Sequence, residues 1–511
     1  MISTTTAGFL ISIIVLFWMW CKRTYSYWKR HGIPYVKPLP IIGTLKDVFK
    51  MEKNVALHIA DMYNYPGMEK EPVVGIYVLH QPALVIREPL LIKSVLIKEF
   101  HNFHDRYCKI DESVDRFGSL NLFFAKYDIW RDMRKKLAPT FTNGKLKLMF
   151  PLLTEIANEL EAYLLKKGDE YITEVKNICG LFTTDSIAST GYGIQVGSFQ
   201  NPYSEFAAQN YNNHQSIPAH DHFIMFLLPK ISKLVRAQMF RKKYDRFLRD
   251  CLKHVMDKRK ESGKERNDLI DTLIRLCKEA EGSDEYPDKD LYIDAILAQG
   301  AVFIVAGYET SLSAIAFTLY LLAKSPKLQK RLREEIKKIL HEGKGEVTYE
   351  ALKSMEYLDM VMRESLRLYP AVGFLERKHH AMDGEFSLEP YHKFKIPNGM
   401  PIFISNYAIH RDPLYWPNPE VFDPERFSPQ NKEGISPYAY LPFGLGPRSC
   451  MGGRLGLLIS KVGVLYFLKN YEVRQCPQTV EKMSFNPNML TLECKDDIIL
   501  QFVKDPLWRN A

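Results

Sequence analysis

Residues 442–453 of the chain read PFGLGPRSCMGG, which spaces Phe443, Gly446, Arg448 and Cys450 as F-x-x-G-x-R-x-C. The glycines allow a tight loop whose backbone amides can donate toward the Cys450 sulfur. An apolar stretch at 455–468 follows and predicts a helix. A lone G-x-R-x-C is more often a turn with a buried cysteine, so the interpretation depends on what lies upstream.

Two charged motifs precede the loop. Glu364 and Arg367 stand three residues apart in a helical pattern, which places them on one helix face. Arg426 lies in Pro424-Glu425-Arg426-Phe427, between that helix and the cysteine. Such a pair is usually solvated, but a carboxylate with two guanidinium groups can be stable in the interior when it is fully hydrogen-bonded.

A third motif, Ala306-Gly307-Tyr308-Glu309-Thr310-Ser311, lies inside a long helical pattern from Ala295 to Ala323. A glycine in mid-helix costs about 1 kcal/mol relative to alanine. A kink or an opened turn at Gly307 would explain why the helix keeps a glycine there, so one of the two is expected. Taken alone, the segment would be an ordinary amphipathic helix.

Together these motifs resemble the cytochrome P450 superfamily. The loop matches F-x-x-G-x-R-x-C-x-G at every fixed position, and E-x-x-R, P-E-R-F and A/G-G-x-D/E-T-T/S occur in the expected order. Trp130 and Arg134 add W-x-x-x-R. The resemblance covers nearly the whole chain and shows no departure at a fixed motif position.

The resemblance implies a haem-thiolate monooxygenase with haem b, whose thiolate ligand favours cleavage of the dioxygen bond. Cys450 would be the iron ligand, and Thr310 and Glu309 would handle oxygen and protons. The other expected haem contacts are Arg448, Phe443, Trp130, Arg134, Arg377 and Arg106. Glu364, Arg367 and Arg426 would form a structural network behind the haem.

The N-terminus predicts a membrane anchor. Residues 1–21 carry no charged side chain, and Lys22 and Arg23 follow immediately, which places the body on the cytoplasmic side. A cleavable signal peptide would need a basic start and a cleavage site of small residues. Three prolines make 22–43 a stiff elbow, and 44–511 would be the catalytic domain. The alternative for 1–21 is a buried helix of the body.

The body is predicted to be mainly α with a smaller β portion, in the cytochrome P450 fold. Alternating patterns at 73–79 and 83–86 suggest a hairpin, and strand-like pieces recur at 394–404 and 498–502. Helical spacing predicts helices at 130–141, 150–165, 239–258, 295–323 and 355–368. No linker or repeat divides the chain, so one large body is expected.

Composition excludes several other classes. The eight cysteines show no CxxC or CxxCH spacing, which argues against a disulfide scaffold, a zinc finger and a c-type haem attachment. The net charge of +9 is spread along the chain rather than concentrated in a stripe, so nucleic acid is not expected as a partner. An acidic protein or an anionic lipid suits this charge better.

Within the family, residues 130–150 and 373–378 look most like the microsomal branch that includes vertebrate drug-metabolising enzymes and, closer still, insect xenobiotic-metabolising enzymes. That implies the endoplasmic reticulum membrane, electrons from NADPH through cytochrome P450 reductase, cytochrome b5 as a further partner, and lipophilic foreign compounds as substrates. Arg131, Lys135, Lys136 and Arg454 are the basic residues expected to dock the reductase. A dedicated hormone or fatty-acid hydroxylase stays open, as do a haem-thiolate isomerase or dehydratase and a gas sensor without turnover.

The same resemblance implies a mostly apolar substrate cavity, whose walls select by size and shape. Its expected lining is 117–124, 223–228, Phe303 and Ile304, 372–374 and Met489. The run at 223–228, FIMFLL, is about equally compatible with a surface loop that dips into the membrane.

Overall fold

The computed structural model describes residues 4–202, 204, 206, 217–284, 288–382 and 384–508. The protein is mainly α with a smaller β portion, as predicted, and its buried apolar residues form one contiguous core. The long helices of the body are α7 (Tyr127–Leu137), α8 (Asn143–Lys166), α9 (Val175–Ile187), α12 (Lys242–Ser262), α13 (Leu269–Gly282), α14 (Lys289–Ala323), α15 (Pro326–Glu342), α17 (Glu356–Leu368) and α19 (Gly453–Asn470). Shorter helices are α2 (Tyr27–Arg30), α3 (Lys46–Phe49), α4 (Val55–Tyr63), α5 (Pro89–Lys93), α6 (Arg116–Leu120), α11 (Ala219–Leu227), α16 (Tyr349–Ser354) and α18 (Asn406–Ile409).

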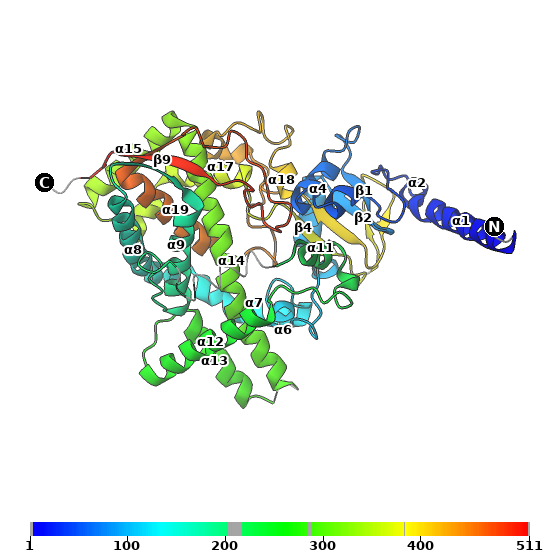
Figure 1. The fold of residues 1–511 in the computed structure, drawn as a ribbon, viewed down its shortest axis with the longest axis horizontal. Helices are drawn as coiled ribbons and strands as arrows, with labels where there is room; N and C mark the ends of the chain where they lie inside the picture. Colours follow the sequence, from blue (N-terminus) through cyan, green and yellow to red (C-terminus); the bar gives the residue numbers. More distant parts are fainter. Residues whose placement is uncertain are drawn as a thin grey trace.

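Helix α14 runs through the middle of the body, with α9 and α19 packed against it (Figure 1). It is apolar on nearly all sides, as expected for a helix surrounded by others. The side chain of Asp288 caps its first turn by accepting a hydrogen bond from the backbone N–H of Leu291. The predicted helix at 295–323 is therefore confirmed, with an earlier start.

The structure shows no opened turn at Gly307, because α14 continues as an unbroken helix through this residue. A Cβ atom on Gly307 would lie 2.6 Å from the Ile187 side chain. Gly307 thus lets α9 approach α14 closely, and packing, rather than an opened turn, explains the glycine.

A four-stranded sheet lies at the end of the body nearest the N-terminal helix (Figure 1). It joins β1 (Val73–Val78), β2 (Gln81–Ile86), β7 (Pro401–Ile404) and β4 (Leu375–Lys378) in that order. The predicted hairpin is confirmed as the antiparallel pair β1–β2. β4 pairs with β7 antiparallel and brings residues 375–378 beside the first hundred residues.

A second sheet orders β3 (Glu170–Glu174), β9 (Ile499–Lys504) and β8 (Tyr471–Arg474), and a third pairs β5 (Phe386–Ser387) with β6 (Lys395–Ile396). The strand predicted in the tail is β9. The stretch predicted as strand-like at 394–404 is divided between β6 and β7.

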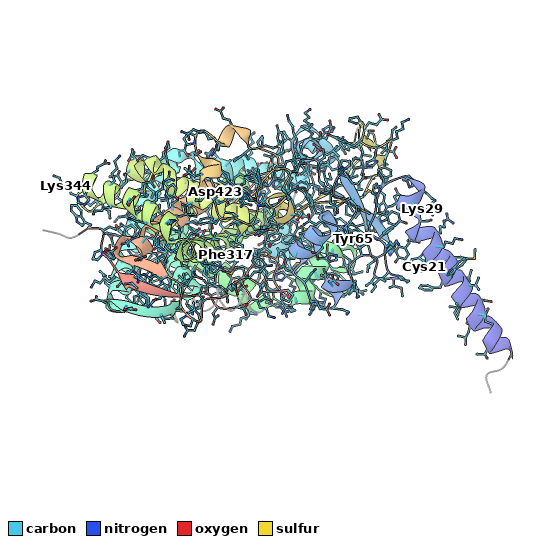
Figure 2. The ribbon with its side chains drawn as sticks, turned by 90° about the horizontal axis from the view of Figure 1, so that it is seen from above. Cys21, Lys29, Tyr65, Phe317, Lys344 and Asp423 are labelled. Atoms are coloured by element: carbon cyan, nitrogen blue, oxygen red, sulfur yellow. The ribbon has the colours of Figure 1, made fainter. Side chains whose placement is uncertain are left out.

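The N-terminal helix α1 (Thr4–Tyr25) projects away from the body in both views (Figures 1 and 2). Its apolar side chains are exposed, and Lys22 and Arg23 lie in its last turn. Of the described helices, α1 and α14 are long and apolar enough to cross a membrane, but α14 belongs to the core. An exposed apolar helix at the chain start indicates a membrane anchor, and the alternative of a helix buried in the body is wrong.

The proline-rich elbow is fastened to the edge of the first sheet. The backbone N–H of Val36 donates to the carbonyl of Gly75 at 2.9 Å, and that of Gly75 donates to Pro34 at 2.7 Å. Trp28, within the elbow and ahead of its prolines, is fully buried, and its indole Nε1 donates to the Ile76 carbonyl at 2.9 Å. These bonds set the direction in which α1 leaves the body.

Candidate functional site

The cysteine loop reverses the chain just before α19. The N–H of Cys450 donates to the carbonyl of Phe443 at 2.8 Å, which closes the loop. Gly446 adopts a φ of 74°, and a Cβ atom there would lie 1.9 Å from the carbonyl oxygen of Leu96. Only glycine fits at this position, because the conformation is left-handed and the neighbouring backbone is in contact.

Cys450 is accessible at its surface although protein atoms surround its thiol. Burial raises the pKa of its thiol, while the N–H groups of Gly452 and Gly453 and the charge of Arg134 lower it. A thiol that is both accessible and desolvated lies on a confined internal space rather than on the outer surface. The donors around it favour the thiolate, the form that binds metal.

The middle of α14 supplies another accessible face. Ala306 is exposed and its nearest neighbours on the helix are half-buried, whereas most of this core helix is buried, so Ala306 also faces an internal space. Thr310 stands one turn later on the same face, and its hydroxyl donates to the Ala306 carbonyl at 2.7 Å. Thr310 is partly exposed and can present its oxygen to a ligand in that space.

Glu309 has a different environment from its neighbour Thr310. It is buried, and its Oε1 accepts a hydrogen bond from the Ser313 hydroxyl at 3.0 Å. Burial lowers the pKa of Lys176 on α9, but the charge of Glu493 and, more weakly, that of Glu309 outweigh it and raise the pKa. The carboxylate would have to turn away from Ser313 to reach the face that carries Thr310.

Three arginines from distant segments gather near the loop. Arg106 Nη1 lies 3.0 Å from Glu376 Oε2, and Arg448 Nη2 lies 3.6 Å from Asp105 Oδ1. Burial, together with the charges of Arg106 and Arg377, lowers the pKa of Arg448 to about 9. Burial likewise lowers the pKa of Arg377 to about 10, with Arg106 acting in the same direction.

These arginines retain unused donors. Within the described part of the chain, Nε of Arg106, Nε of Arg377 and Nη1 of Arg448 are buried and have no hydrogen-bond partner. Buried guanidinium donors without acceptors are costly, and carboxylates are their usual partners. The residues present therefore fit a ligand with carboxylate groups, which is what the expected haem offers.

Trp130 and Arg134 lie one turn apart on α7, as predicted. The Arg448 guanidinium lies over the Trp130 ring at 4.4 Å, and Arg134 Nη1 donates to the Ser449 carbonyl at 2.7 Å. The W-x-x-x-R motif is thereby joined to the cysteine loop. Phe443 packs against Gly453 at the start of α19, where a Cβ atom would lie 3.1 Å from its ring.

Glu364, Arg367 and Arg426 form the ion-paired group that the family resemblance implied. Arg367 Nε donates to Glu364 Oε2 at 2.7 Å, and Arg426 Nε lies 3.3 Å from Glu364 Oε1. The side chains of Glu364 and Arg367 are completely buried. Their position between α17 and the 3-10 turn η6 (Pro424–Phe427) makes the group structural.

His410 is a structural residue of the site that was not predicted from the sequence. Its Nδ1 donates to the Arg367 carbonyl at 3.1 Å, and its Nε2 accepts from the N–H of Leu441 at 2.7 Å. Burial lowers its pKa to about 3, so the ring stays neutral and keeps both bonds. It links the end of α17 to the residue just before the cysteine loop. A single histidine after α18 carries no pattern that would have identified it.

An aromatic cluster joins three of the segments expected to contact substrate. Phe226 of α11 lies 5.8 Å from Phe123, 5.8 Å from Phe124 and 5.9 Å from Phe374, measured between ring centroids. By contrast, Phe303 packs against Phe141 at 5.0 Å. The cluster is apolar throughout.

The membrane-dipping loop is wrong for 223–228, because the side chains from Phe223 to Leu228 are buried. The exposed apolar side chains come a few residues later: Leu234 is 83% exposed, and Ile231 and Val235 accompany it. Tertiary packing against the body distinguishes the two neighbouring apolar runs.

Comparison with known proteins identifies the relatives of the chain. A family model for cytochrome P450 matches residues 33–500. The chain is 40% identical over 497 residues to a Drosophila melanogaster protein named probable cytochrome P450 6w1, with 96% of each chain covered. It is 40% identical over 513 residues to probable cytochrome P450 6v1 of the same species, covering 98% of this chain and 99% of that one. Cytochrome P450 6j1 of Blattella germanica is 34% identical over 506 residues, with 98% of each chain covered.

Proposed function

The chain belongs to the cytochrome P450 family of haem-thiolate monooxygenases. From that premise we propose that it oxidises lipophilic foreign compounds, such as plant toxins or insecticides. The electrons would come from NADPH and be delivered by a reductase. The observation that carries the proposal is the accessible Cys450 thiol beside buried arginines that have unused donors.

Cys450 is the proposed iron ligand. Bound haem would supply the activation of molecular oxygen, aided by electron density from the thiolate. Arg106, Arg377, Arg448 and Arg134, with Trp130, would hold its carboxylates, and Phe443 would pack beside it. The unused donors of the arginines support this assignment.

Thr310 is the proposed positioning group for protons. Its hydroxyl already donates to Ala306, so its lone pairs stay available to accept a hydrogen bond from a water molecule. A water held there would deliver protons to one place and limit loss of oxygen as peroxide. Glu309 would replenish these protons after it turns away from Ser313.

Substrate selection would rest on the aromatic cluster of Phe123, Phe124, Phe226 and Phe374. A wall of phenyl rings offers area and shape but no fixed polar handle. Such a wall discriminates weakly between apolar molecules of similar size, which suits a broad range of foreign compounds better than one hormone.

Anchoring and electron supply complete the proposal. Residues 1–21 would anchor the chain in the endoplasmic reticulum membrane, 22–43 would orient it, and 44–511 would face the cytoplasm. Arg131, Lys135 and Arg454 are exposed and would dock the reductase or cytochrome b5. Lys136 contributes less, because it already pairs with Asp132 at 3.1 Å.

The experiment combines the full-length chain with reductase, NADPH and a panel of lipophilic toxins, steroids and fatty acids. We expect NADPH-dependent oxidised products from several unrelated toxins. Turnover of one steroid or fatty acid alone would favour the dedicated hydroxylase, and haem spectra without any product would favour a sensor.

A pair of variants tests the α14 face in the same assay. Thr310→Ala should keep haem and NADPH consumption but yield less product and more hydrogen peroxide per NADPH. Ser311→Ala is the matched control, because this adjacent hydroxyl is buried toward α19, 3.6 Å from a Cβ built on Gly456. Equal coupling in both variants would remove Thr310 from the proposed role.

A further inference from the structure

The structure places three metal-ligating side chains together outside the proposed haem contacts. His104 and Asp105 come from the loop before α6, and His380 follows β4. One ligand atom of each lies within 4.8 Å of the other two. Asp105 Oδ2 is 3.2 Å from His380 Nε2 and 3.8 Å from His104 Nε2.

We propose that His104, Asp105 and His380 form a binding site for a divalent transition metal of the zinc class. Two imidazoles and one carboxylate are a donor set that zinc takes, with water as the fourth ligand. Zinc–nitrogen bonds of about 2.0 Å in a tetrahedral site separate neighbouring ligand atoms by roughly 3.3 Å. The edge from Asp105 Oδ2 to His380 Nε2 already has this length, and the other edges shorten when the side chains rotate about their torsions.

Backbone hydrogen bonds hold the loop that carries His104 and Asp105 beside the residues that carry His380. The N–H of Lys378 donates to the Asp105 carbonyl at 3.0 Å, and that of His380 donates to the Asn102 carbonyl at 2.7 Å. The rings of His104 and His380 stack at 4.6 Å between centroids and 17° between planes. The backbone is already in place for binding, but one ring must turn out of this stack before both in-plane electron pairs point at one ion.

Both imidazoles can present a free electron pair to the metal. His104 Nδ1 lies 2.6 Å from the His101 carbonyl, which can only accept, so the proton sits on Nδ1 and Nε2 is free. His380 Nε2 lies 3.2 Å from Asp105 Oδ2, but it is buried and makes no hydrogen bond to the described residues, so it is available as a ligand atom.

Asp105 would join the metal to Arg448. Its Oδ2 faces the two histidines, while its Oδ1 lies 3.6 Å from Arg448 Nη2. An arginine on the second oxygen orients the carboxylate, although its positive charge opposes a dication. The side chains of Asp105 and His380 are partly exposed, so an ion can arrive from solvent without crossing the core.

The test measures zinc binding to the full-length, haem-loaded protein by calorimetry after removal of bound metals with a chelator. We expect one zinc ion whose affinity falls at least tenfold in His380→Gln and, independently, in His104→Gln. The reduced carbon monoxide spectrum should be unchanged in both variants, which would show that haem and fold are intact.

His392→Gln is the matched control. His392 Nε2 lies 3.7 Å from Glu71 Oε2, so it is also a partly buried histidine beside a carboxylate, but the described residues include no second histidine in that cluster. Zinc affinity should not change in this variant. Unchanged affinity in both His380→Gln and His104→Gln, or an equal loss in His392→Gln, would overturn the proposal. Failure of the monooxygenase assay would not affect it, since the site does not rest on the proposed function.

Discussion

Replacing Glu364 with glutamine tests whether the buried ion-paired group stabilises the fold. The carboxylate accepts four hydrogen bonds: two from Arg367 at 2.7 and 2.8 Å, one from the N–H of Asp423 at 3.0 Å and one from Arg426 at 3.3 Å. The glutamine keeps the size of the side chain but turns one acceptor into a donor that faces arginine.

The expected loss of unfolding free energy follows from Arg367, the partner that remains after Glu364 is replaced. Arg367 is completely buried, so the substitution leaves a guanidinium charge in the interior without its counterion. Breaking one side of a buried pair costs about 3–5 kcal/mol. Burial raises the pKa of Glu364 despite the pull of both arginines, which shows that desolvation offsets much of their attraction. The cost therefore arises from the uncompensated Arg367.

Urea unfolding of the purified protein, followed by tryptophan fluorescence, measures this loss. Trp416 is a suitable reporter, because the Arg367 guanidinium lies 5.3 Å from its ring. The control is Glu425→Gln, an exposed carboxylate in the same region that pairs with exposed Arg331 and should cost no more than about 1 kcal/mol. Equal unfolding free energies for the two variants would refute the reasoning.

Three further predictions concern pH, the ligand and the partner. Burial raises the pKa of Asp185 from 3.8 to about 6, so its stabilising contribution is present below pH 4 and is lost as pH rises through 6. The unfolding free energy of the wild type should therefore fall relative to Asp185→Asn by up to about 3 kcal/mol between pH 4 and 7, and a constant difference in urea titrations would contradict this. Cys450→Ser should abolish the reduced carbon monoxide spectrum while Cys108→Ser retains it, and survival of the spectrum in Cys450→Ser would mean that another cysteine is the ligand. Lys135→Glu should raise the reductase concentration for half-maximal turnover severalfold at low salt, more than Lys136→Glu does, and no change at low salt would exclude Lys135 from the docking surface.

The cysteine loop and the helices around it could be predicted because their signals are local. Gly446 and Cys450 stand at fixed spacing within one turn of chain, and the apolar period of α14 spans 35 residues. Glu364 and Arg367 share a helix face by spacing alone. In each case the interacting residues are near neighbours in sequence, so helix and turn geometry suffices.

Other features could not be predicted, because they depend on which segments meet. The sequence predicted a kink or an opened turn at Gly307, whereas the structure shows the Ile187 side chain of α9 packed against it. Glu309 and Thr310 belong to one motif, but the packing of α9 and α19 around α14 gives them different environments. The apolar run at 223–228 is buried, whereas Leu234 nearby is exposed.

By itself, then, the sequence determined the family and the order of its motifs, because short-range spacing encodes them. Only the tertiary structure decided that Arg106, Arg377 and Arg448 share one cluster with unused donors, and that His104 and Asp105 meet His380. These residues lie more than 270 positions apart at their extremes, and their meeting depends on the strand pairing that brings β4 to the first sheet and on the backbone bonds beside it. The physical reason is that long-range contacts form through cooperative burial of whole elements, which no local pattern specifies.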